Sequence, residues 1–182
     1  AAQRVATIGG WGYLFGDEGS AFWMARQALA HAMAQSDAGR SSALGVSALC
    51  FFKEPSLREI AHAFYAREIS RPQLARFAGA VIDTAQGGDP AAAGILDEAV
   101  TALAMLAQRV AAALESAAAP RVAFLGGLMQ RDEVRHGAQE KLRRMLPRAD
   151  IQRPRFEPAV GALMLAYQED GQQVPFLQTA VS

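Results

Sequence analysis

The chain is poor in cysteine and carries no net charge, and both features narrow the classes of protein to which it can belong. Its single cysteine, Cys50, cannot form an internal disulfide, so the sequence fits a reducing compartment and we expect a cytoplasmic protein. Basic and acidic side chains number 18 each, so no overall charge favours nucleic acid or an acidic membrane. Neither a secretory signal pattern nor an unbroken apolar run of membrane-spanning length is apparent. We therefore expect neither nucleic-acid nor membrane partners.

Motifs of several enzyme classes are also missing. The histidines, His31, His62 and His136, are scattered without the spacing of metal ligands, so no metal site is expected. No nucleophile elbow or Ser-His-Asp order is present. The run "FLGG" at 124–127 lacks the Lys-Ser or Lys-Thr of a Walker motif and the third glycine of a dinucleotide fingerprint. The sequence thus offers no simple hydrolase, metalloenzyme or dehydrogenase signature.

What the chain does have is apolar residues, which make up 51% of it, enough for a sizeable core. Short β-branched or apolar runs predict strands at 4–8, 121–125 and about 151–156. Helical spacing and capping residues predict helices at about 19–35, 43–53, 57–64, 71–86, 90–118, 131–145 and 158–168. This order indicates an α/β fold whose sheet is too narrow for so much helix, as if strands were missing on the N-terminal side. Cys50 lies in the apolar run "ALCFF", which favours a buried position.

The stretch "GGWGYLFGDEGSAFW" at 9–23 is the most unusual part of the sequence. Its glycines allow close approach of a ligand to backbone, Asp17 can accept hydrogen bonds from sugar hydroxyls, and an indole can pack on a pyranose. The alternative is a tight turn in which Asp17 or Ser20 caps the following helix and both tryptophans lie in the core. Spacing alone favours this second interpretation.

A strand that ends in Gly126-Gly127 before a helix is a common way to lay a nucleotide against bare backbone. Arg131 follows four residues later and lies within reach of such a ligand. Taken alone, this pattern occurs more often as a packing turn than as a site. The basic helix that follows has no interleaved aromatic residues, so we interpret it as a solvated face.

Together these motifs resemble one known family. "GGWGYLFGDEGSAFW" is similar to the signature of N-acetylglucosamine kinases and of their relatives, the BadF/BadG/BcrA/BcrD-type ATPases of the actin/hexokinase/Hsp70 superfamily. The segments "LARFAGAVIDTAQGGDPAA", "VAFLGGLM" and "PAVGALMLA" follow in the family's order, so the resemblance covers essentially all of the chain.

The resemblance implies that residues 1–182 are a single C-terminal domain of an actin/hexokinase-like (ribonuclease H-like) fold, with a helical insertion at 41–118. The N-terminal domain, its phosphate loop, the catalytic aspartate and the first hairpin of the C-terminal domain would then lie outside this sequence. The implied reaction is phosphoryl transfer from ATP, with Mg²⁺, to the 6-hydroxyl of an amino sugar. On its own, the chain is expected to be inactive.

The resemblance also implies two sets of ligand-binding residues. No catalytic residue or metal ligand is among them. The sugar site would comprise Gly10, Trp11, Gly12, Tyr13, Leu14 and Asp17. The nucleotide site would comprise Ala78, Gly126, Gly127 and Arg131.

Two other functions stay open. One is an ATPase that activates a partner enzyme, although such relatives usually carry iron–sulfur cysteines and this chain has one cysteine. The other is a non-catalytic domain that senses sugar or serves as a dimer interface. In each case, we expect a homodimer.

Overall fold

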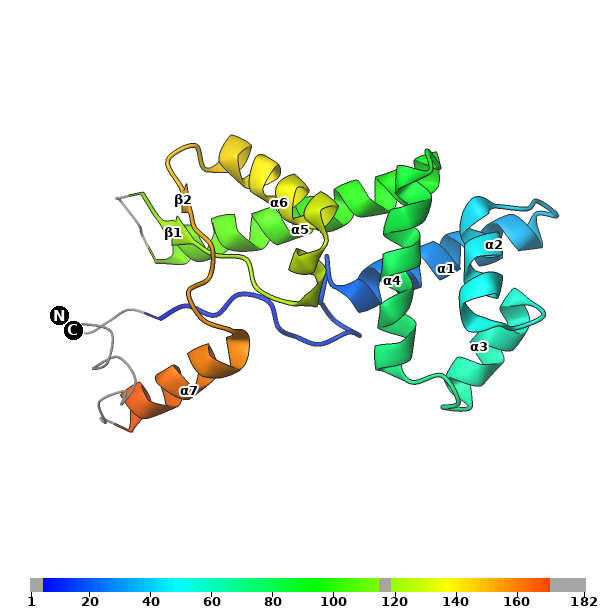
Figure 1. Ribbon diagram of the computed structural model, residues 1–182, viewed down its shortest axis with the longest axis horizontal. Helices are drawn as coiled ribbons and strands as arrows, with labels where there is room; N and C mark the ends of the chain where they lie inside the picture. The colour runs from blue at the N-terminus through cyan, green and yellow to red at the C-terminus, as the bar shows by residue number, and fades with distance from the viewer. Residues whose placement is uncertain (1–4, 115–118, 171–182) are drawn as a thin grey trace.

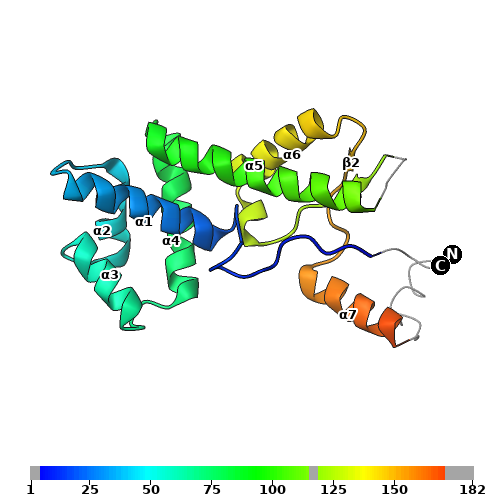
Figure 2. The same ribbon diagram turned by 180° about the vertical axis from the view of Figure 1, so that it is seen from behind.

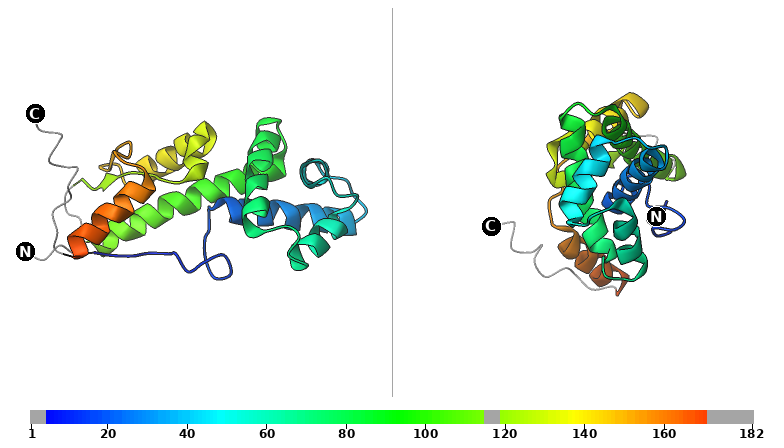
Figure 3. Two further views of the ribbon diagram at one scale, coloured as in Figure 1. Left: turned by 60° about the horizontal axis from the view of Figure 1, so that its bottom comes forward. Right: turned by 90° about the vertical axis from the view of Figure 1, so that its right-hand side faces the viewer.

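The computed structural model describes residues 5–114 and 119–170, and within these ranges the chain is mostly helical. Figure 1 shows an elongated molecule in which the helices α2 (Ala43–Phe52) and α3 (Leu57–Tyr65) lie at one end. The other helices are α1 (Ala21–Asp37), α4 (Arg71–Gln86), α5 (Pro90–Ala113), α6 (Asp132–Met145) and α7 (Pro158–Glu169). A short 3₁₀ helix, η1 (Gly127–Gln130), precedes α6. Figure 3 shows α7 near the opposite end from α2 and α3.

The helices begin where the sequence places capping residues. The side chains of Ser20, Ser42 and Ser56 each accept a hydrogen bond from a backbone N–H of the helix that follows. Ser70 forms a reciprocal capping box with Gln73 at the start of α4, and Asp89 caps α5 just before Pro90. Because each cap satisfies N–H groups that have no partner within the helix, local sequence decides these boundaries.

The core lies where α4 crosses the other long helices. Figures 1 and 2 show α4 running steeply across α1 and α5, and α1 packs chiefly on α4 while α5 packs chiefly on α6. Met24 of α1, Phe77 and Ile82 of α4, and Val134 of α6 are fully or almost fully buried. Apolar stripes at helical spacing predict these buried faces, and burial of this area is the main stabilising contribution.

The sheet is smaller than the sequence predicts. Strands β1 (Arg121–Val122) and β2 (Asp150–Ile151) pair in parallel, with Arg121 opposite Asp150. Residues 123–125 and 152–156 therefore leave the ladder early, and residues 5–8 form no strand although their sequence favours one. A strand persists only beside a hydrogen-bonding partner, and the described residues supply one pair of strands. The α/β pattern is present, with an incomplete sheet and many helices.

The expected burial of Cys50 is also wrong. Cys50 is exposed at the surface of α2, because Leu44 and Ala48 form the buried face of that short helix. Within the described residues, one helix, α5, is long and apolar enough to cross a membrane by length and composition alone, although Asp97, Glu98 and Arg109 interrupt its apolar run. Its residues Ile95, Ala99, Val100 and Ala104 are buried within the protein, and length and composition alone are weak evidence of a membrane span.

The expected helical insertion at 41–118 contains α2 to α5 within its described part, and residues 115–118 lie outside the described residues. The predicted long helix accordingly ends at Ala113 in the described structure.

Candidate functional site

A cavity of about 720 Å³ lies between three segments that are far apart in the sequence. One wall is the glycine-rich loop that leads into α1, a second is one face of α4 with two leucines of α5, and the third is the segment from Leu125 to Arg131. This volume falls within the range of small-molecule sites. The cavity is therefore large enough for a nucleotide or a sugar.

The loop wall depends on Gly19, where the chain passes close to α5. Gly19 is buried with φ +83°, and a Cβ atom there would lie 2.7 Å from the carbonyl oxygen of Ala99 and 2.9 Å from Cγ of Leu103. Both the left-handed backbone and the lack of space require glycine. Gly19 thus fixes how closely the loop approaches the leucine wall of the cavity.

Asp17 occupies an unusual backbone position in the same loop. Its φ is +64°, a conformation that aspartate adopts more readily than most residues. Ser20, and not Asp17, caps α1, because the Ser20 hydroxyl accepts the hydrogen bond from the Trp23 backbone N–H at 3.1 Å. Asp17 lines the cavity, and its carboxylate makes no hydrogen bond or ion pair with the described residues. It is therefore available to a ligand.

The third wall exposes bare backbone at Gly126 and Gly127. Gly126 has φ +119° and ψ 167°, a region open essentially to glycine alone. A Cβ atom at either position would meet no other atom within 4 Å, so both glycines face open space. A flat ligand can lie directly against this backbone.

On the α4 wall, the small residues Ala75, Ala78 and Gly79 line the cavity together with Arg76. Arg76 is exposed and has no hydrogen-bond or ion-pair partner among the described residues. Sequence reasoning singles out Ala78 but misses Arg76 and Gly79. A glycine in the interior of a helical pattern was the available signal for Gly79, since it lowers helix stability without an obvious local reason.

Arg131 reaches from the third wall to α4. Its Nη2 donates to Oδ1 of Asp83 at 2.5 Å, and its Nε lies 3.4 Å from Oε2 of Glu133. The hydrogen bond to Asp83 raises the pKa of the Arg131 guanidinium, and desolvation opposes this rise in part. Arg131 is thus charged and already paired in this structure.

The structure brings together six of the ten residues that the sequence analysis expects to bind ligands. Both predicted sets contribute to the one cavity, with Gly10 and Asp17 from the sugar set and Ala78, Gly126, Gly127 and Arg131 from the nucleotide set. Glu18 also lines it. Segments that are separated by about a hundred residues in the chain thus form one site.

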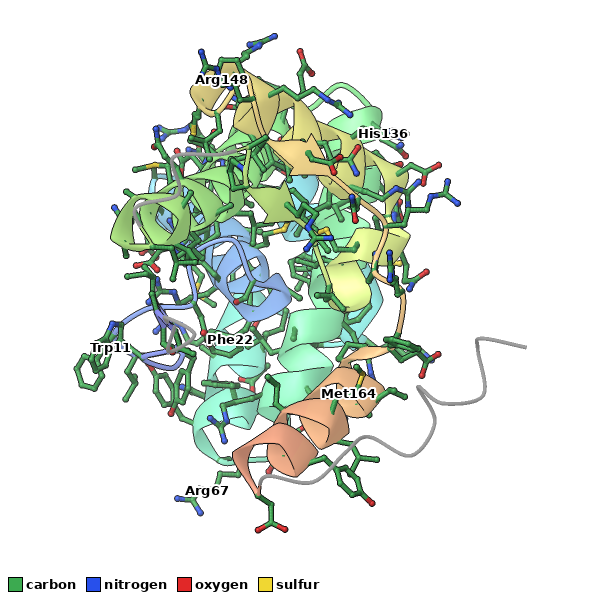
Figure 4. All side chains as sticks on the ribbon, turned by 90° about the vertical axis from the view of Figure 1, so that its left-hand side faces the viewer. Trp11, Phe22, Arg67, His136, Arg148 and Met164 are labelled. Atoms are coloured by element: carbon green, nitrogen blue, oxygen red, sulfur yellow. The ribbon has the colours of Figure 1, made fainter. Side chains whose placement is uncertain are left out.

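The other four residues, Trp11, Gly12, Tyr13 and Leu14, do not line the cavity. Figure 4 shows Trp11 projecting from the loop away from the rest of the molecule, and 76% of it is exposed. The ring of Tyr13 packs edge-on against Phe22 and lies 4.7 Å from the guanidinium carbon of Arg71. Trp23 packs partly buried against the core. The two tryptophans therefore differ in burial, and Trp11 does not reach the cavity.

Among the described residues, no group of three or more histidine, cysteine, aspartate or glutamate side chains is placed to hold a metal ion. Proteins commonly hold Mg²⁺ through one or two carboxylates together with substrate phosphates, so this finding concerns a site built from protein side chains alone.

Comparison with known proteins assigns the family. The model of the BadF/BadG/BcrA/BcrD ATPase family matches residues 2–166. A search of curated proteins gives no significant match. Among solved structures, the chain is similar to a protein from Chromobacterium violaceum that is provisionally assigned as an N-acetylglucosamine kinase, with a TM-score of 0.64 and 30% identity.

That similarity covers 86% of this chain and 50% of the kinase chain, so the chain spans about half the length of its solved relative. The match includes the glycine-rich loop, α4 and the Gly126-Gly127 segment, which are the three walls of the cavity. The chain belongs to the BadF/BadG/BcrA/BcrD ATPase family.

Proposed function

We propose that the full-length protein is an ATP-dependent amino-sugar kinase that phosphorylates the 6-hydroxyl of N-acetylglucosamine or a related sugar. The observation that carries this proposal is the single cavity in which Gly10 and Asp17 lie with Ala78, Gly126 and Gly127. A kinase has to bring a sugar and a nucleotide to the same place, and two separately motivated sets of residues meet there. The similarity to a solved chain described as an N-acetylglucosamine kinase supports the choice of substrate.

In this proposal the chain supplies binding and orientation. Gly126 and Gly127 offer bare backbone to the nucleoside beside Ala78, and the Asp17 carboxylate accepts hydrogen bonds from sugar hydroxyls. Trp11, Gly12, Tyr13 and Leu14 stay predicted sugar-site residues, although they lie outside the cavity. A residue that takes the proton from the 6-hydroxyl, and the ligands of Mg²⁺, would come from the part of the fold that corresponds to the other half of the solved relative. The chain would then be the C-terminal domain of an actin/hexokinase-like fold.

The test measures ADP production by the full-length protein from ATP, with and without N-acetylglucosamine, glucosamine and glucose. Amino-sugar-dependent ADP formation supports the kinase. ADP formation that is independent of every sugar favours the ATPase that activates a partner enzyme. Sugar binding without turnover favours the sensing domain, and light scattering tests the expected homodimer in the same samples.

Asp17→Asn tests the sugar contact itself, because asparagine also tolerates the left-handed backbone while the charge is lost. Loss of hydrogen bonds to a charged acceptor weakens binding by about 1.5–3 kcal/mol, roughly 10- to 150-fold in the sugar Kd measured by calorimetry. Asp37→Asn, at the exposed end of α1, is the matched control. An unchanged sugar Kd in Asp17→Asn would contradict the assigned role of Asp17.

A further inference from the structure

Four polar side chains connect the last turn of α4 to the start of α6. Arg131 donates to Asp83 of α4 and approaches Glu133 of α6, and Gln86 of α4 donates to Glu133. Asp83 and Gln86 lie three residues apart on one helix face, and Arg131 and Glu133 lie two residues apart at the start of the other helix. The four side chains form a series of three contacts between two elements that are almost 50 residues apart in the sequence.

The Asp83 carboxylate lies at an unfavourable position within its own helix. It lies in the last turn of α4, where the helix dipole disfavours a carboxylate. Glu133, in contrast, lies in the first turn of α6, where the dipole favours it. The partner that offsets the unfavourable position of Asp83 is Arg131.

These contacts join two walls of the cavity, and of the four residues Arg131 lines it. Arg131 lines the cavity together with Gly126 and Gly127, and Gly79, one turn before Asp83, lines it from α4. The segment between the glycines and Arg131 is a single turn of 3₁₀ helix, held by the hydrogen bonds Met129 N–H to Gly126 O and Arg131 N–H to Leu128 O. The Asp83–Arg131 pair therefore fixes the distance between the bare glycine backbone and α4.

The carboxylates beside Arg131 make it a poor binding site for a phosphate group. One guanidinium faces two carboxylates, so this corner of the cavity carries a net charge of about −1 and is unfavourable for a phosphate. Arg76, which has no such partner among the described residues, is the cavity cation that is free for an anion.

We propose that Asp83 and Arg131 are a positioning pair that holds the Gly126-Gly127 wall against α4 for the nucleoside, and that Arg131 does not contact the phosphates. This inference rests on the proposed nucleotide site. It assigns the nucleoside to the Asp83–Arg131 end of the cavity. In this proposal Arg131 positions one wall of the site, whereas the resemblance implies that Arg131 contacts the nucleotide.

The test compares Asp83→Asn with Asp97→Asn in the full-length protein. Asp97 pairs with Lys141 at 2.7 Å between α5 and α6, and its side chain is 62% exposed, against 63% for Asp83. Asp97 does not line the cavity, so the two variants lose equivalent surface ion pairs in different places. Asp83→Glu restores the charge and tests for rescue.

The measurement is the Kd of adenosine and of ADP by calorimetry. We expect Asp83→Asn to weaken both ligands by the same factor, about three- to fivefold, as expected for one partly exposed ion pair. Asp97→Asn should change neither Kd, and Asp83→Glu should recover part of the loss. Weakening of ADP alone would show that Arg131 contacts phosphate, and equal weakening in Asp97→Asn would show a general stability effect. Either result overturns the inference.

Hydrogen exchange separates failure of this inference from failure of the proposed function. If the wild-type protein binds neither adenosine nor ADP, the nucleotide site is wrong, but the pair is still tested at the Met129 and Arg131 amides. Exchange of these two amides should accelerate about three- to fivefold in Asp83→Asn and not in Asp97→Asn. Unchanged exchange would refute the positioning role.

Discussion

Gly79 offers a test in which stability and ligand binding are expected to change in opposite directions. It lies in the interior of α4, and a Cβ atom there would meet no other atom within 4 Å because it would point into open space at the cavity. Alanine has the higher helix propensity, so Gly79→Ala should raise the free energy of unfolding by about 0.5–1 kcal/mol. Gly94 of α5 is its control, since its Cβ would also meet nothing within 4 Å and it lies outside the cavity.

The effect on binding should grow with the size of the side chain. If a nucleoside lies on the α4 surface, an added methyl group meets it, and Gly79→Leu places a larger obstacle there without lowering helix propensity below that of glycine. Overpacking of this kind costs about 1–3 kcal/mol, which corresponds to roughly a 5- to 150-fold increase in the Kd of ADP. Urea unfolding and calorimetry measure the two quantities on the same samples.

The matched variants Gly94→Ala and Gly94→Leu should gain similar stability with an unchanged Kd for ADP. If Gly79→Leu binds ADP as tightly as the wild-type protein, the nucleoside does not lie along this face of α4 and the prediction is wrong. A lower free energy of unfolding in Gly79→Ala would instead show that a Cβ atom at this position collides with other atoms.

Two further predictions concern the same cavity. Gly19→Ala should lower the free energy of unfolding by about 1–3 kcal/mol, because its Cβ would collide with the Ala99 carbonyl and its backbone is left-handed. Gly10 is also left-handed, but a Cβ there would meet no atom within 4 Å. Urea titration of Gly10→Ala therefore measures the cost of the backbone conformation without the collision. Arg76→Gln should raise the Kd of ADP about tenfold and leave that of adenosine unchanged, because the free guanidinium is expected to pair with phosphate. Arg26→Gln, exposed on α1 and away from the cavity, is its control, and an equal loss of adenosine binding would show that Arg76 stacks on the base instead.

Much of the helical framework follows from local sequence. The caps at Ser42, Ser56, Ser70 and Asp89 appear where the sequence predicts helix starts, because a cap satisfies neighbouring N–H groups and needs no distant partner. The buried faces follow from helical spacing for the same reason. Cys50 shows the limit, since an all-apolar short helix does not reveal which of its sides will be covered.

The strands were less predictable because a ladder needs a second strand. Residues 5–8 and 123–125 have strand-forming sequences, yet within the described residues only Arg121–Val122 finds a partner, Asp150–Ile151. Pairing is a property of the assembled sheet, and no local pattern specifies it.

By itself, the sequence determined the helix boundaries, the amphipathic faces and the glycine-rich motif that places the chain in its family. Tertiary structure alone decided which loop residues reach the cavity: Asp17 lines it, whereas Trp11 and Tyr13 do not. It also decided the state of Arg131, whose partner Asp83 lies 48 residues away in sequence. A charge is neutralised by whatever lies within a few ångströms, and only the packing of α4 against the start of α6 brings these two side chains together.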